Sequence, residues 1–155
     1  MRAVLTRVNS ASVSIGGEVV GQIGKGFLIL LGVGPNATEK ECRYLAEKAL
    51  GLRVFTDENE KMNLGLDAVG GQVLVVSQFT LYGNCRKGRR PRFPDAANPE
   101  LGNALYEKFL SVCEELGYPP QHGRFGADMQ VESVNDGPVT LILDTDQLMD
   151  TPRRS

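Results

Sequence analysis

The sequence of 155 residues contains no tryptophan, one histidine and three cysteines. The cysteines, Cys42, Cys85 and Cys113, are odd in number, and no two of them form a Cys-x-x-Cys pair. A zinc site or redox dithiol needs closely paired ligands, and a disulfide framework needs an even set. The pattern therefore argues against both kinds of site. It predicts a protein of a reducing compartment without a metal site. We expect no cofactor either.

A single histidine leaves little scope for histidine-based catalysis. Any Ser-His-Asp or Cys-His arrangement would have to use His122. This residue lies among Pro119, Pro120 and Gly123, where a surface or turn position is more typical, and the chain has no Gly-x-Ser-x-Gly motif. We therefore expect His122 to take no part in catalysis.

Long apolar runs and a strong net charge are also missing. No segment approaches the roughly 18 consecutive apolar residues that a membrane helix needs, and the first residues alternate instead of forming an unbroken apolar stretch. The formal net charge of -2 at pH 7 gives no overall attraction to nucleic acid, so any such binding must come from a local patch. These absences predict a soluble, cytoplasmic protein with no membrane partner.

The composition itself is that of an ordinary globular protein. Hydrophobic residues make up 41% and charged residues 23% of the chain. A chain of this size can bury a core without disulfide or metal support. We therefore expect a single domain over residues 1–150, with residues 151–155 as a frayed tail.

Short β-rich segments alternate with two helical segments. Gly16-Gly17 predicts a hairpin, and residues 27–31 are apolar on both faces, as in a central strand. A Thr38 capping box and an Asn98-Pro99 cap each predict the start of a helix. The expected fold class is α/β: one layered domain with a mixed, largely antiparallel and barrel-like sheet and two main helices.

The remaining elements are predicted from shorter patterns. Residues 73–81 predict a strand that is apolar in its first half and polar in its second. The other predictions are a strand over 52–55, an irregular connection over 57–71, and two strands over 129–135 and 139–143.

A dense basic loop follows the 73–81 segment. Five of the seven residues from Arg86 to Arg92 are Arg or Lys. Such a loop is either a solvated surface with no partner or a local patch for the phosphates of a nucleic acid. The sequence pattern alone leaves both interpretations open.

The stretch from Asn135 to Thr140 contains Asp136-Gly137-Pro138 between the two predicted C-terminal strands. Asp-Gly alone would serve a hairpin, whereas Pro138 removes a main-chain donor and restricts Gly137. An X-Pro bond is also the common place for a cis peptide. The segment is therefore either a tight turn with a rigid exit or a backbone element that presents carbonyl oxygens to a ligand.

Two motifs resemble the signatures of the D-aminoacyl-tRNA deacylases, the hydrolases that free tRNA from D-amino acids. They are Ser77-Gln78-Phe79-Thr80-Leu81 and Asn135-x-Gly137-Pro138-x-Thr140, and the resemblance extends to Lys61-Met62-Asn63 and to residues 123–129. It implies an enzyme that cleaves the ester of D-aminoacyl-tRNA, and of glycyl-tRNA mischarged on a non-cognate tRNA. It also implies a homodimer.

The resemblance further implies roles for individual residues. The catalytic group would be Ser77, Gln78, Phe79 and Thr80, with the Phe79 N–H as oxyanion donor. Gly137 and Pro138 would form a cis-peptide element that reaches into the partner subunit's active site and rejects L-amino acids; Asn135 and Thr140 belong to the same substrate-binding motif. The tRNA-binding residues would be Arg86, Lys87, Arg89 and Arg90, which would hold the acceptor end.

Two questions remain open at this stage. Thr80 is either a nucleophile or a positioning group, and positioning is favoured because no base is evident and the family is described as using the ribose 2′-hydroxyl of its substrate. The function is either that of the deacylase or that of a non-catalytic RNA-binding module using the Arg86–Arg92 loop. A small-ester or D-amino-acid peptide hydrolase that needs no RNA is a further alternative.

Overall fold

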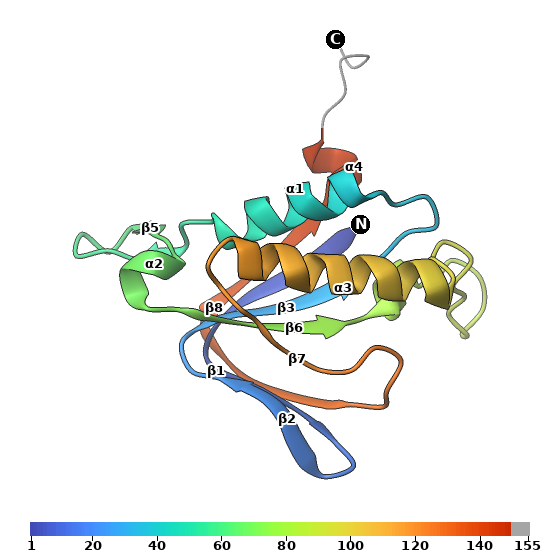
Figure 1. The fold of residues 1–155 in the computed structure, drawn as a ribbon, viewed down its shortest axis with the longest axis horizontal. Helices are drawn as coiled ribbons and strands as arrows, with labels where there is room; N and C mark the ends of the chain where they lie inside the picture. The colour runs from blue at the N-terminus through green and yellow to red at the C-terminus, as the bar shows by residue number, and fades with distance from the viewer. Residues whose placement is uncertain (150–155) are drawn as a thin grey trace.

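A computed structural model describes residues 1–149 of the chain (Figure 1). The predicted tail, residues 151–155, lies outside the described residues. The largest elements are β1 (Arg2–Ile15), β2 (Glu18–Ile23), β3 (Gly26–Gly32), α1 (Glu39–Leu50), β6 (Gln72–Ser77), α3 (Pro99–Glu115) and β8 (Gln130–Asp144). The shorter ones are β4 (Phe55–Thr56), β5 (Met62–Leu64), α2 (Leu66–Val69), the 3-10 helix η1 (Phe79–Tyr82), β7 (Gln121–His122) and α4 (Thr145–Leu148).

The main sheet has the strand order β2-β1-β3-β6-β7, and β8 pairs with β1. Strand β1 is antiparallel to β2, β3 and β8, whereas β6 is parallel to β3 and to β7. Residues 2–8 of β1 pair with β3 and residues 11–15 pair with β2, so the sheet bends where β1 changes partner. The β1–β2 hairpin accordingly projects away from the rest of the sheet in Figure 1. The predicted α/β class with a mixed sheet is confirmed.

Helices α1 and α3 lie side by side over one face of this sheet (Figure 1). Both begin where their caps predict: the Thr38 side chain accepts from the Glu41 N–H, and the Asn98 side chain accepts from the Leu101 N–H. Apolar side chains of the helices and of β1, β3 and β6 form the larger core. Phe109 is fully buried there, and its truncation to alanine would cost about 3–5 kcal/mol.

Three predicted boundaries outside the first motif are wrong, and for two of them a distant contact is the cause. The strand over 52–55 is reduced to Phe55–Thr56 in a separate two-stranded sheet, because the Val54 carbonyl accepts from the Arg7 side chain at 2.6 Å instead of from a strand. The connection over 57–71 contains β5 and α2. The two strands over 129–135 and 139–143 are one element, β8, because β1 pairs with both parts.

No helix among the described residues has the length and apolar character needed to cross a membrane.

Candidate functional site

The first motif lies where β6 ends and the chain turns into η1. The predicted strand over 73–81 stops at Ser77, because β3 offers its last partner there: the Gln78 N–H donates to the Leu31 carbonyl at 2.7 Å. The chain then turns with 3-10 bonds, from the Leu81 N–H to Gln78 O at 3.2 Å and from the Gly83 N–H to Thr80 O at 2.9 Å. Phe79 and Thr80 are therefore helical rather than extended.

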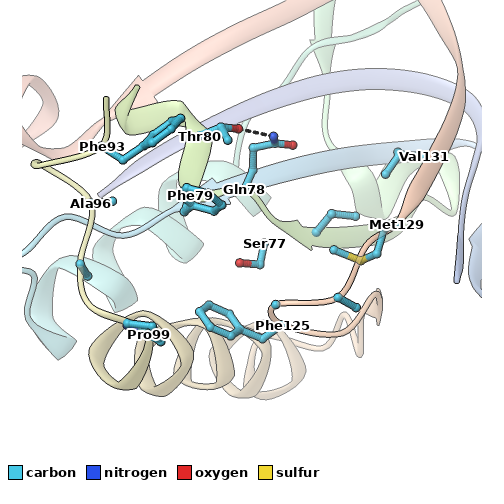
Figure 2. Close-up of a pocket in the computed structure, with 14 residues that line it drawn as sticks. Ser77, Gln78, Phe79, Thr80, Phe93, Ala96, Pro99, Phe125, Met129 and Val131 are labelled. Atoms are coloured by element: carbon cyan, nitrogen blue, oxygen red, sulfur yellow. Dashed lines mark hydrogen bonds between the residues drawn. The ribbon is translucent and has the colours of Figure 1, made fainter. Parts of the chain in front are cut away.

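All four residues predicted to be catalytic, Ser77, Gln78, Phe79 and Thr80, border one cavity of about 580 Å³. Figure 2 shows Phe93 beside Phe79 and Thr80, and Pro99 on α3 across the cavity from them. Phe125 and Met129 approach from the segment that leads into β8, and Val131 from the start of β8 itself. Apart from its place in the family resemblance, the 123–129 segment carries no local pattern that predicts this position.

Among residues 1–149, no ionisable side chain lines the cavity. Its lining consists of Val76, Ser77, Gln78, Phe79, Thr80, Phe93, Ala96, Ala97, Pro99, Phe125, Gly126, Ala127, Met129 and Val131. The only histidine of the chain, His122, is exposed on β7 and is not among them. The cavity thus offers hydrogen-bonding and apolar groups, but no side chain of its own that could act as a general base near neutral pH.

Two main-chain donors of η1 are free. In the part of the chain that the structure describes, neither the Phe79 N–H nor the Thr80 N–H donates to a protein acceptor. The Thr80 hydroxyl accepts a hydrogen bond from the Gln78 side-chain amide (Figure 2). This contact orients the Thr80 hydroxyl but cannot remove its proton, because an amide N–H is a donor.

Aromatic rings make much of the cavity wall apolar. Phe79 and Phe93 meet edge to face, with ring centroids 5.0 Å apart. Phe125 packs against the buried Tyr106, with centroids 6.0 Å apart. The Phe79 side chain is 56% exposed, so its face is available to a ligand. Such walls suit a planar, stackable group.

The second motif forms a bulge in β8. Between the pairs Val8↔Asn135 and Thr6↔Thr140, β8 has four residues where β1 has one. The Gly137–Pro138 peptide bond in this bulge is cis. Asn135 holds the two sides together: its Oδ1 accepts from the Val139 N–H at 2.9 Å and its Nδ2 donates to the Thr140 hydroxyl at 3.0 Å.

The Arg7 side chain of β1 contacts this bulge, and no sequence motif marks Arg7 as part of the site. Arg7 is only 7% exposed. Nε donates to the Asp136 carbonyl at 3.0 Å and lies 3.3 Å from the Asp136 carboxylate, and Nη1 donates to the Val54 carbonyl. The alternating pattern of β1 gives no local sign that this arginine side chain is buried.

The two motifs do not meet within one chain. None of Asn135, Gly137, Pro138 and Thr140 lines the cavity beside η1. The register explains this separation: the Arg7 row of the sheet continues to Phe27 and Val73, whereas the Ala3 row continues to Leu31 and Ser77. The bulge and the cavity therefore lie toward opposite ends of the strands.

The predicted tRNA-binding residues, Arg86, Lys87, Arg89 and Arg90, are all exposed. Asn84 and Arg92 close the loop through paired main-chain bonds of 2.6 and 2.9 Å. Among the described residues, no carboxylate forms an ion pair with any of the four side chains. Thr80 before the loop and Phe93 after it both line the cavity, so the loop lies next to its mouth.

The described residues contain no group of three or more His, Cys, Asp or Glu side chains that could hold a metal ion. The titratable groups with shifted pKa values do not line the cavity. Burial raises the pKa of the Cys42 thiol in α1 and of the Cys113 thiol in α3 to about 12. The Arg43 guanidinium, through a hydrogen bond of 2.7 Å, lowers the pKa of Glu115.

Known proteins resemble this chain over nearly its whole length. A curated relative from Desulfatibacillum aliphaticivorans, named D-aminoacyl-tRNA deacylase, is 60% identical over 94% of this chain and 99% of its own. A solved structure described as c-Myc DNA Unwinding Element Binding Protein has 41% identity and a TM-score of 0.87, and the match covers 93% of this chain and 98% of that one.

A second solved structure, of a probable eukaryotic D-amino acid tRNA deacylase, has 20% identity and a TM-score of 0.78. The match covers 92% of this chain and 97% of the other, and it shows that the fold is shared. The model of the family described as D-Tyr-tRNA(Tyr) deacylase matches residues 4–144. The chain therefore belongs to the D-Tyr-tRNA(Tyr) deacylase family.

Proposed function

We propose that this chain hydrolyses the ester between a D-amino acid and the terminal ribose of tRNA in the cavity beside η1. Glycyl-tRNA mischarged on a non-cognate tRNA is a further substrate. One observation carries this assignment of the site: Phe79 and Thr80, whose main-chain N–H groups have no acceptor among the described residues, line a cavity to which those residues contribute no ionisable side chain. Such a site suits a reaction that needs electrostatic stabilisation and positioning rather than a protein base.

The Phe79 N–H is the main oxyanion donor. Ser77 and Gln78 support it by holding the end of β6 in place, since the Gln78 N–H donates to the Leu31 carbonyl. Attack on an ester carbonyl turns its oxygen into an oxyanion, and a prepositioned donor stabilises the negative charge. One such donor is worth roughly 2.7 to 4 kcal/mol in other enzymes. The aromatic walls at Phe93 and Phe125 suit the terminal adenine, which places the adjoining ribose ester beside η1.

The nucleophile is supplied through the substrate. The ribose 2′-hydroxyl adjoins the ester, and holding the two groups in fixed geometry replaces a bimolecular encounter. Thr80 is a positioning group here, because Gln78 donates to its hydroxyl and no base lines the cavity. Covalent attack by Thr80 would need an activating base.

A homodimer would complete the site. In one chain, the Gly137–Pro138 bulge lies away from the cavity, so it can act as a selectivity wall only in a partner subunit. A two-fold arrangement repeats every contact, and each bulge would then reach the other subunit's cavity. A backbone wall that fills the space of an L side chain rejects every L-amino acid by collision, whereas glycine has no side chain to collide.

The sheet face away from α1 and α3 supports this pairing. Val76 at the cavity, Leu30, Val4 and Ile142 form one row across four strands by register. Ile142 is 77% exposed at the outer end of this row. An apolar row that runs from the cavity to an exposed strand is what a second copy of the chain would cover.

The loop residues Arg86, Lys87, Arg89 and Arg90 bind the phosphates of the tRNA acceptor end. They are exposed, carry no ion-pair partner among the described residues and adjoin the cavity. Phosphate contacts of this kind give affinity with little sequence preference. A tRNA substrate and three free cysteines support a cytoplasmic location.

The second candidate function is nucleic-acid binding without catalysis. It draws support from the relative at 41% identity, which is described as a DNA unwinding element binding protein. One assay separates the two: ester loss from matched D- and L-tyrosyl-tRNA with equal amounts of protein. Rapid loss of the D form alone supports the deacylase. Binding of both forms with neither ester cleaved supports the second candidate and rejects the first.

A further inference from the structure

The Arg2 side chain makes three contacts that the proposed mechanism does not use. Nε donates to the Asp144 carboxylate at 3.1 Å, and Nη1 donates to the Leu81 carbonyl at 3.0 Å. The guanidinium carbon also lies 4.4 Å from the centre of the Tyr82 ring. Two of the three partners, Leu81 and Tyr82, belong to η1, which carries Phe79 and Thr80 into the cavity.

Main-chain bonds fix the beginning of η1 but not its end. The Gln78 N–H is held by the Leu31 carbonyl of β3 at 2.7 Å. The carbonyl of Leu81 lies at the end of the helix, where no further helical N–H can reach it. The Arg2 guanidinium donates to this carbonyl instead. The start of η1 is therefore bonded to β3 and its end to β1.

We propose that Arg2 is a positioning residue for the active site, which holds η1 so that the Phe79 and Thr80 N–H groups keep their place at the reacting ester. The inference rests on the proposed function, since it assigns a task to η1 in that reaction. Small displacements of a positioned group are costly: a misplacement of about 1 Å can lower a rate about a hundredfold.

Asp144 in turn orients Arg2. Its Oδ2 accepts from Arg2, and its Oδ1 accepts from the Asp146 N–H at 2.9 Å. A guanidinium can donate to the carboxylate and to the carbonyl while its face packs on the ring, because its donors lie in one plane. A lysine ammonium is a single charged point and can serve only part of this set. Arg2→Lys is therefore a graded variant and Arg2→Met a full loss.

Arg43 provides the matched control. Its Nη2 lies 2.7 Å from Glu115, and the Arg43 side chain is 42% exposed against 39% for Arg2. This pair joins α1 to α3, and neither residue lines the cavity. Arg43→Met thus removes an arginine of similar exposure and its ion pair without touching the cavity.

The test measures kcat and KM for D-tyrosyl-tRNA in the wild type, Arg2→Met, Arg2→Lys and Arg43→Met. We expect Arg2→Met to lower kcat at least about tenfold with KM changed less than about threefold, Arg2→Lys to lie between, and Arg43→Met to match the wild type. Amide hydrogen exchange supplies a second measurement. Exchange at Leu81 and Gly83 should rise in Arg2→Met, less in Arg2→Lys and not in Arg43→Met, while the amides of β1 and β3 keep their protection.

The outcomes separate this inference from the proposed function. A wild type that leaves D-tyrosyl-tRNA intact rejects the proposed function and the inference together. An active wild type with Arg2→Met within about twofold of it in kcat rejects the inference alone. Exchange that rises equally throughout the sheet of Arg2→Met also rejects it, because Arg2 would then support the fold as a whole.

Discussion

The buried Arg7 donates from Nε to the carbonyl oxygen of Asp136 at 3.0 Å, directly before the cis Gly137–Pro138 bond. The same guanidinium donates from Nη1 to the Val54 carbonyl at 2.6 Å. One side chain of β1 thus joins the bulge of β8 to the segment that leads into β4. Whatever the bulge does, its position depends on this arginine.

Arg7→Met should therefore loosen the bulge and weaken chiral selection. Removing the guanidinium leaves the Val54 and Asp136 carbonyls without their partner, at a cost of about 1–3 kcal/mol each where they stay buried. We expect the D-to-L ratio of tyrosyl-tRNA hydrolysis to fall at least about tenfold, together with a lower Tm. Arg7→Lys should recover part of the stability but not the ratio, since an ammonium cannot reproduce the fork. An unchanged ratio in Arg7→Met would contradict the assigned role.

Gly137→Ala should lower both stability and activity on D-tyrosyl-tRNA. Gly137 has φ +131°, and a Cβ there would lie 2.8 Å from Arg7 Nη2 and 2.8 Å from Val139 Cγ2. A residue held in such a conformation costs of order 1–3 kcal/mol, and the close contact with Arg7 adds to it. Gly17→Ala is the control, because Gly17 has φ +85° but nothing within 4 Å of its Cβ position. It should lose some stability and keep its activity.

Arg7 and η1 also show where sequence reasoning reached its limit. The motifs around Ser77 and Gly137 are local patterns and could be found directly. Arg7 could not, since its partners lie 47 and 129 residues away along the chain. Phe79-Thr80-Leu81 has the composition of a strand, and it becomes helical because β3 has no partner left beyond Leu31. The fold class can be predicted from the local pattern of apolar and polar residues. The end of a strand depends on where its neighbouring strand stops pairing, which the local pattern does not contain.

Thr80→Ala should retain measurable activity, because Thr80 positions rather than attacks. We expect a loss of about ten- to a hundredfold in kcat, the usual range for a lost positioning contact. A tRNA that ends in 2′-deoxyadenosine should suffer a larger loss with the wild-type protein. The decisive measurement is mass spectrometry of quenched reactions: an acyl group found on Thr80 would overturn the positioning role.

The three thiols should differ sharply in reactivity. Cys42 and Cys113 are buried, and burial raises the pKa of each from 9.0 to about 12, so about one in ten thousand of either thiol is ionised at pH 8. The pKa is raised, so the neutral thiol is favoured at every pH below it. Cys85 is exposed. Titration of the native protein with a thiol reagent at pH 8 should show one fast thiol, lost in Cys85→Ser, and two more after denaturation.

Charge reversal in the basic loop should change the salt dependence of tRNA binding more than the chemistry. Arg89 and Arg90 are exposed and have no ion-pair partner among the described residues, so each is free to neutralise a phosphate. Each phosphate contact on a single strand contributes about 0.7 to the slope of log K against log salt. The double variant Arg89→Glu and Arg90→Glu should therefore lower the slope by about 1.4 and raise KM, with kcat at saturation near the wild-type value.

The control is Arg43→Glu in α1, which should leave the slope unchanged. If the loop variant kept the wild-type slope and affinity, the loop would be a solvated surface, and the acceptor end would have to be bound elsewhere.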